Sequence, residues 1–149
     1  MSRRGSCPCG AVRFTVVGPL RDVIVCHCDA CREANGGLPW AASAAQRGDL
    51  ELEAPAAVAW RQAPVSSYGA SRGLCRACGA YVLWDAPGRT TISVGAGLLD
   101  GGRDLHVAAH IWVAPEERDA LRERGIPAHA GGMPDGITVA WQGETPSTG

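Results

Sequence analysis

Several features that would place this chain in a membrane or on a nucleic acid are missing from its sequence. No apolar run among the 149 residues approaches the roughly 20 residues of a membrane-spanning helix. Arg3 and Arg4 near the N-terminus are not followed by the apolar stretch of a signal peptide. The formal net charge is −1 and no basic stripe is present, so neither a nucleic acid nor a membrane is expected as a partner. We expect a soluble, cytoplasmic protein.

Long helical patterns are also scarce. Twenty Gly and ten Pro predict many turns, which favours short strands over long helices. The length suits one domain over residues 1–149, with a core of useful size, and the polar tail 143–149 is expected to be frayed.

Short strands are predicted wherever apolar and polar residues alternate or β-branched residues cluster. A helix is predicted from Pro115 to the stop at Gly125, because acids come early and arginines late. A shorter helix is expected over 28–34, and 65–73 is interpreted as a turn-rich loop. The predicted strands are 11–18, 22–26, 38–45, 50–53, 58–61, 80–85, 90–94, 106–114 and 137–141.

The seven cysteines decide the class of protein. An odd number cannot all pair within one chain, and the spacings C-x-C, C-x-C-x-x-C and C-x-x-C are short. In a cytoplasmic chain such spacings indicate metal ligands more often than disulfides.

Two of these cysteine groups share a design. Cys7 and Cys9 in "CPCG", and Cys75 and Cys78 in "CRACG", each supply two thiols followed by a glycine that permits a sharp turn. If the first pair lies in an extended segment, its two side chains face the same side. Together the pairs predict a closed four-thiol tetrahedron suited to structural zinc, and an iron site is the less favoured alternative.

Three cysteines remain, in "CHCDAC": Cys26, Cys28 and Cys31. Three protein ligands with an open fourth position are typical of catalytic zinc. The alternative is a second structural site that a distant histidine completes, and the residues alone leave the two about equal. His27 should point away from an ion that its neighbours share, and His110 in "AAHIWVA" could be a core histidine. His106 and His129 are the other candidates.

The order of the motifs "GSCPCGAVRF", "CHCDACREANG", "CRACGAYVLW", "GAGLLDGG" and "HIWV" resembles the glutathione-dependent formaldehyde-activating enzyme (GFA) family, which also includes centromere protein V. The resemblance covers about residues 5–113. It implies a mainly β fold of small coiled antiparallel β-sheets organised around zinc (Mss-four-like), here with one short C-terminal helix.

The resemblance also implies two zinc ions per chain. Cys7, Cys9, Cys75 and Cys78 match the ligands of a structural zinc, and Cys26, Cys28 and Cys31 match the second, open zinc at the active site. The implied activity is that of a carbon–sulfur lyase, which forms or cleaves S-hydroxymethyl adducts of formaldehyde and a thiol such as glutathione. A non-catalytic zinc module that binds a thiol metabolite or a protein partner is the alternative.

The chain departs from the family in two places. Leu74 stands where the family usually has Phe, and the last third after "HIWV" matches weakly, so the substrate could differ. Arg32 is the nearest candidate to clamp a carboxylate of the substrate, weighed against a solvated helix charge. Trp40 could line a pocket, whereas Trp84 and Trp112 are expected in the core.

Overall fold

The computed structural model describes residues 2–63 and 69–143 of the chain. Most of the tail that we expected to be frayed (144–149), and the first part of the expected loop 65–73, lie outside the described residues. The helices are α1 (Asp29–Ala34) and α2 (Pro115–Glu123). The strands are β1 (Ser2–Ser6), β2 (Arg13–Val17), β3 (Val23–Cys26), β4 (Trp40–Gln46), β5 (Leu50–Leu52), β6 (Val58–Gln62), β7 (Ser71–Cys75), β8 (Tyr81–Asp85), β9 (Thr91–Gly95) and β10 (Val107–Ile111).

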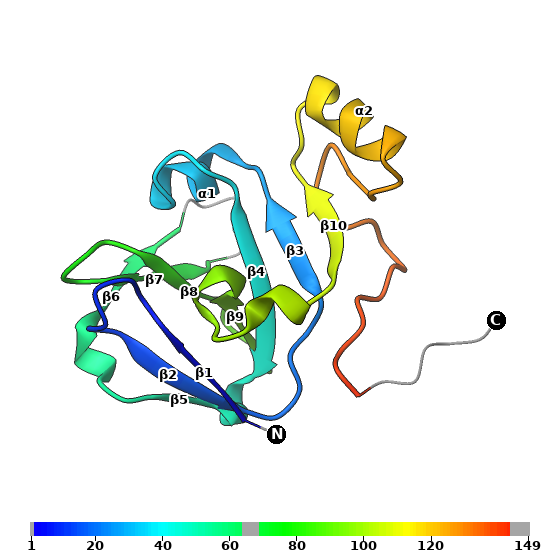
Figure 1. Cartoon of the computed structure of the whole chain (residues 1–149). Helices are drawn as coiled ribbons and strands as arrows, with labels where there is room; N and C mark the ends of the chain where they lie inside the picture. Colours follow the sequence, from blue (N-terminus) through cyan, green and yellow to red (C-terminus); the bar gives the residue numbers. More distant parts are fainter. Residues whose placement is uncertain (1, 64–68, 144–149) are drawn as a thin grey trace.

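The strands form two sheets over the described residues (Figure 1). One sheet has three strands in the order β1-β2-β5, and the other has seven in the order β10-β3-β4-β9-β8-β7-β6. All neighbours are antiparallel except β10 and β3, which run parallel. The prediction of a mainly β fold with small sheets and one short C-terminal helix is confirmed, with this parallel pair as the exception to antiparallel pairing.

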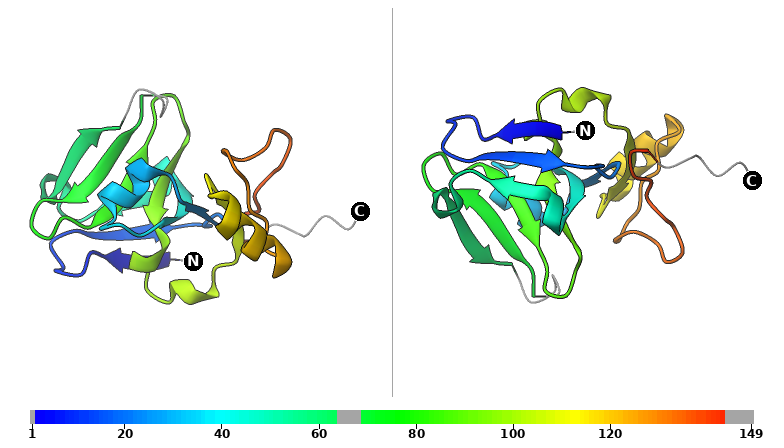
Figure 2. Two further views of the ribbon diagram at one scale, coloured as in Figure 1. Left: turned by 90° about the horizontal axis from the view of Figure 1, so that it is seen from above. Right: turned by 90° about the horizontal axis from the view of Figure 1, so that it is seen from below.

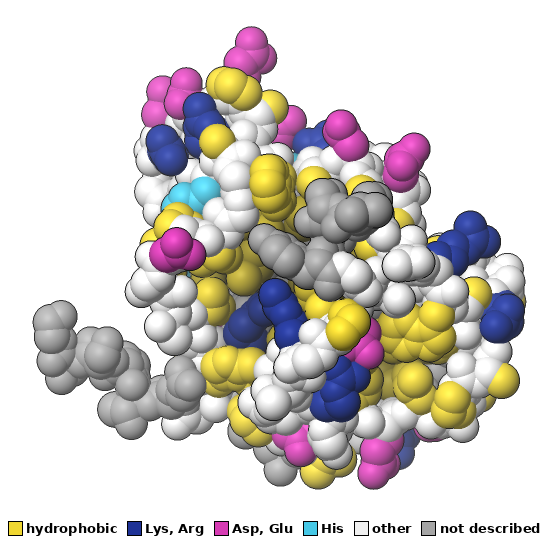
Figure 3. Space-filling model, turned by 180° about the vertical axis from the view of Figure 1, so that it is seen from behind, with side chains coloured by type: hydrophobic (Ala, Val, Ile, Leu, Met, Phe, Trp, Pro, Cys, Tyr) yellow, Lys and Arg dark blue, Asp and Glu magenta, His cyan; other side chains and the backbone are white. Residues whose placement is uncertain are grey.

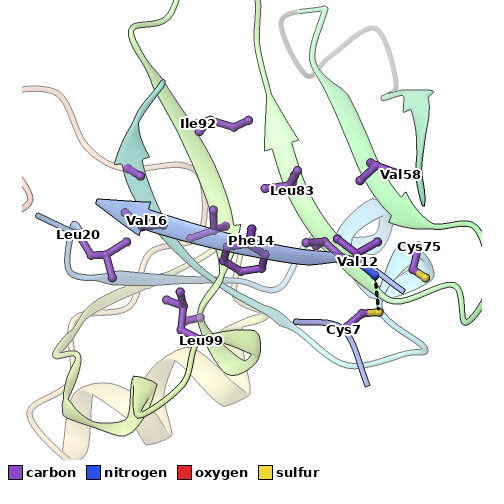
Figure 4. Close-up of a cluster of buried hydrophobic side chains, with 14 of the residues drawn as sticks. Cys7, Val12, Phe14, Val16, Leu20, Val58, Cys75, Leu83, Ile92 and Leu99 are labelled. Carbon is purple, nitrogen blue, oxygen red and sulfur yellow. Dashed lines mark hydrogen bonds between the residues drawn. The ribbon is translucent and has the colours of Figure 1, made fainter. Parts of the chain in front are cut away.

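The main hydrophobic core lies between the two sheets (Figure 4). The alternation predicted around β2 is confirmed, because Val12, Phe14 and Val16 are buried and Arg13 is exposed. Leu83 of the larger sheet belongs to the same cluster, so β2 contributes one wall of the core and β8 another. Figure 4 also shows two of the cysteines at one edge of this core.

Two strands were missed because their sequences carry no strand pattern. β1 reads "SRRGS" and pairs in continuous register with β2. A Cβ atom on its Gly5 would overlap the ring of Phe14 and lie 2.9 Å from the carbonyl oxygen of Leu98, so only glycine permits this approach. β7 begins inside the expected turn-rich loop, and pairing on both sides makes it a strand.

Two other expectations were wrong. Residues 137–141 form no regular strand: an isolated bridge pairs Trp141 with Arg21, and the amide of Asp22 donates to the carbonyl of Ala140 (2.8 Å), just before β3. Cys7 and Cys9 do not lie in an extended segment but in a turn between β1 and β2, closed by the amide of Gly10 donating to the carbonyl of Cys7 (3.0 Å).

Helix α2 stands apart from the two sheets, beyond the end of β10 (Figures 1 and 2). No helix in the described ranges is long and apolar enough to cross a membrane. On the face seen in Figure 3, arginines and acidic side chains are interspersed, so charge of one sign does not dominate that face.

We predict that Phe14→Ala lowers the free energy of unfolding by about 3–5 kcal/mol, because the ring is 1 % exposed at the centre of the core. Urea unfolding measures the loss. Val17→Ala on the same strand is the matched control, since Val17 is 49 % exposed and should change stability by less than about 0.5 kcal/mol. Equal losses in the two variants would contradict the assignment of this core.

Candidate metal centres

The four-thiol cluster unites the turn after β1 with the turn between β7 and β8. The sulfurs of Cys7, Cys9, Cys75 and Cys78 all lie within 4.8 Å of one another. The Sγ atoms of Cys7 and Cys9 are 3.5 Å apart, and those of Cys9 and Cys75 are 3.7 Å apart. Zn–S bonds of about 2.3 Å in a tetrahedron place sulfurs about 3.8 Å apart, so this cluster fits such an ion.

Backbone amides stabilise negative charge on these sulfurs. The amide of Val12 donates to Cys7 Sγ (3.3 Å) and that of Cys78 donates to Cys75 Sγ (3.4 Å). Burial opposes the Cys7 thiolate, but the Val12 amide and the neighbouring thiols outweigh it and lower the pKa of Cys7 to about 6. Glycines in the left-handed region follow both pairs, Gly10 with φ +79° and Gly79 with φ +78°, as the predicted sharp turns require.

The three-thiol cluster lies where β3 ends and α1 begins. The sulfurs of Cys26, Cys28 and Cys31 are within 4.8 Å of one another, and those of Cys26 and Cys28 are 3.4 Å apart. Cys28 caps α1, since its sulfur accepts a hydrogen bond from the amide of Cys31 (3.3 Å). The amide of Cys78 donates to the sulfur of Cys75 in the same way, so the C-x-x-C turns of both clusters contain the same amide-to-sulfur hydrogen bond.

The three thiols differ in proton affinity. A hydrogen bond from the Cys31 thiol outweighs burial and lowers the pKa of Cys26. The same hydrogen bond and burial raise the pKa of Cys31 well above its usual range. A metal ion must therefore displace protons from these thiols when it binds.

Within residues 2–63 and 69–143, no histidine or carboxylate joins the Cys26–Cys28–Cys31 cluster as a fourth ligand. The interpretation of His27 is confirmed: its ring is 7 % exposed, and its Nε2 lies 2.8 Å from Nδ1 of His110. Burial lowers the pKa of both rings. In a neutral pair one ring nitrogen donates and the other accepts, which fixes both rings.

Glu117 of α2 extends this network. Its Oε2 is 3.3 Å from His27 Nδ1 and its Oε1 is 3.6 Å from a terminal nitrogen of Arg32. Arg32 also donates from Nε to the carbonyl of His27 (3.0 Å). The side chain that we considered as a substrate clamp is thus engaged in holding the backbone between Cys26 and Cys28.

On another side of the cluster, Cys31 packs against Trp40 and Tyr81. These two rings stack with their centroids 3.8 Å apart, and Trp40 Nε1 donates to the Tyr81 carbonyl (3.2 Å). The Tyr81 hydroxyl and Arg72 Nε are buried without a hydrogen-bond partner in the described part of the chain. Burial first, and the nearby Cys31 second, raise the pKa of Tyr81, so its hydroxyl keeps its proton.

The structure brings together every cysteine that the sequence singled out, in the two predicted sets. The sequence analysis missed Arg72, Tyr81 and Glu117, because only contacts between segments that are distant in the sequence bring them near the three-thiol cluster. The first three residues of β8 are all buried, so no alternation in its sequence marks Tyr81 as facing the cluster. The expectation for Trp112 was wrong, since its side chain is 52 % exposed.

These features define a mainly β, cysteine-rich protein with two thiol clusters that could each hold a metal ion. The family model of the glutathione-dependent formaldehyde-activating enzyme matches residues 2–115, and the chain belongs to this family. A crystal structure of a Rhodobacter sphaeroides protein is similar in fold, with a TM-score of 0.55 and 24 % identity over 85 % of this chain and 98 % of that one. No match was found among curated proteins.

We predict that His110→Ala lowers the free energy of unfolding by about 1–3 kcal/mol, because it leaves a buried ring nitrogen of His27 without its partner. Urea unfolding of the metal-loaded protein measures the effect. His106→Ala is the control, since that residue is exposed and should change little. If both variants unfold at the same urea concentration as the parent, the histidine pair does not stabilise the site.

Proposed function

We propose that this protein is a zinc-dependent carbon–sulfur lyase that adds a low-molecular-weight thiol such as glutathione to formaldehyde, and reverses that addition. A C–S bond forms, the C=O π bond becomes a C–O single bond, and the thiol proton ends on that oxygen, so nothing is oxidised. The observation that carries the proposal is the set of three thiols, Cys26, Cys28 and Cys31, with no fourth protein ligand among the described residues. Membership of the family supports it.

Both clusters fit zinc by the chemistry of their ligands. Cys7, Cys9, Cys75 and Cys78 would hold a structural ion, and Cys26, Cys28 and Cys31 would hold the ion of the active site. When bound by three thiolates, zinc supplies Lewis acidity and affinity for a further sulfur ligand.

The protein's own groups would orient the reaction. The Cys31 amide donates to the sulfur of Cys28, and the pairing of His27 with His110 fixes the residue between Cys26 and Cys28. The stacked rings of Trp40 and Tyr81 cover Cys31 and exclude water from that side. The unpartnered Tyr81 hydroxyl is the group that we propose donates a hydrogen bond to the carbonyl oxygen as negative charge develops there.

We predict two zinc ions per chain when the purified protein is analysed by mass spectrometry under native conditions. Cys31→Ala should lose one ion yet remain folded, because its cluster lies at one end of the larger sheet. Cys78→Ala should unfold or aggregate, because the four-thiol site closes a long loop of chain. One ion in the parent, or equal unfolding of both variants, would contradict the division into a structural and an active-site ion.

We predict that the protein accelerates exchange between free formaldehyde and its glutathione adduct, as measured by NMR exchange spectroscopy. Cys31→Ala, which should keep the structural ion, is the control for uncatalysed addition and should show no acceleration. Tyr81→Phe should reduce the acceleration about 100-fold, as loss of one such hydrogen-bond donor does in other enzymes. No acceleration by the parent, together with measurable glutathione binding, would favour the non-catalytic thiol-binding module instead.

A further inference from the structure

A pocket of about 630 Å³ lies between α1, β6 and β7, and its lining includes Cys75 of the four-thiol cluster and Ala30, the residue before Cys31. Its lining includes three arginines, Arg61, Arg72 and Arg76, and one carboxylate, Glu33. A volume of roughly 300–1,000 Å³ is typical of sites for small molecules. None of these charged groups belongs to the two candidate metal clusters or to the His27–His110 pair.

Two of the arginines are cross-strand neighbours. Arg61 and Arg72 are direct partners in the register of β6 and β7, so their side chains leave the sheet on the same face. Like charges at directly opposite positions destabilise a strand pair. No salt bridge of either residue is found over the described residues. An anion in the pocket would remove this repulsion.

The surroundings of Arg72 are the stronger indication that this pocket binds an anion. The residue is 8 % exposed, and its buried Nε donates to no group in the part of the chain that the structure describes. A buried Nε–H without an acceptor is costly unless a ligand supplies one, even though the guanidinium carbon of Arg72 also lies 5.8 Å from the centre of the Tyr81 ring. A carboxylate is the ligand that matches the planar fork of donors on arginine.

The pocket is continuous with the surroundings of the proposed active site. Ala34 and Leu74 line it and also pack against the apolar cluster that contains Cys31. Arg72 lies close enough to Cys31 for its charge to lower the pKa of that thiol. A molecule whose sulfur reached the three-thiol cluster could therefore place its remaining atoms in this pocket.

We propose that this pocket binds the charged amino-acid end of the thiol substrate, with its carboxylate on Arg72 and Arg61 and its ammonium group near Glu33. This inference rests on the proposed function for the sulfur end of the substrate. It selects thiols that carry a carboxylate, such as glutathione, over thiols of similar reactivity that carry none. Arg76 at the rim contributes long-range attraction, since its Nε is already engaged with the carbonyl of Ala56 (2.9 Å).

Binding is tested first with S-methylglutathione, which keeps the charged groups of glutathione but has no free thiol. Titration into ¹⁵N-labelled protein should shift the Nε–H resonance of Arg72 and give a dissociation constant. Arg72→Gln should weaken binding about 10- to 100-fold, as loss of a charge-assisted hydrogen bond does. Arg61→Gln, at the exposed rim, should weaken binding less, and Glu33→Gln should weaken glutathione but not N-acetylated glutathione.

Arg124→Gln is the matched control, because Arg124 is exposed at the end of α2, remote from the pocket lining. It should bind S-methylglutathione as the parent does. Equal affinities of Arg72→Gln, Arg61→Gln and the parent would overturn the proposal, as would binding that leaves the Arg72 resonance unmoved. Arg61→Gln keeps the test decisive if Arg72→Gln fails to fold.

A comparison of thiols separates this inference from the proposed function. In the NMR exchange assay, Arg72→Gln should lower the ratio of kcat/KM for glutathione to that for 2-mercaptoethanol, which has no carboxylate, about 10- to 100-fold. An unchanged ratio with acceleration intact would reject the pocket but keep the lyase. Absence of acceleration with either thiol in the parent would reject the lyase, whatever the binding result.

Discussion

The contact between the sulfurs of two distant turns is the constraint on which the rest of the structure depends. Cys9 and Cys75 are 66 positions apart in the chain, and their sulfurs lie 3.7 Å from each other. This contact holds the β1–β2 turn against the β7–β8 turn, so the small sheet must lie across the large one with the core between them (Figure 4). Cys7 and Cys75 are themselves members of that core, which joins thiol chemistry and hydrophobic packing in one place.

The three-thiol cluster depends on a different feature, the single parallel pair in the larger sheet. Because β10 runs alongside β3, Ile111 lies opposite Cys26 and accepts a hydrogen bond from the amide of His27 (3.0 Å). The ring of His110 then lies beside that of His27, the residue between Cys26 and Cys28. The three thiols thus come from one short segment, whereas the ring that packs against His27 comes from a strand about 80 residues further along.

Local signals were enough to predict the two thiol clusters but not their surroundings. Cysteine spacing and the alternation around Phe14 act over a few residues, so the sequence indicated both thiol sets and β2. β1 and β7 are strands only because neighbours pair with them, and no residue pattern in "SRRGS" indicates this. The role proposed for Arg72 depends on its position opposite Arg61. A single sequence does not reveal that register. Even the prediction for Cys7 and Cys9 reached the right set through the wrong local geometry, since a turn replaces the expected extended segment.

Glu117 contacts His27 and Arg32 from a helix that lies almost entirely beyond residues 2–115, the part of the chain matched by the family model. The seven cysteines and the carboxylate that contacts His27 and Arg32 therefore lie in separate stretches of the chain. Mutation in the helix can retune the site while the cysteine framework stays untouched. The sequence of α2, which supplies the contact to His27 and Arg32, can therefore change independently of the seven cysteines, all of which lie within the segment that the family model covers.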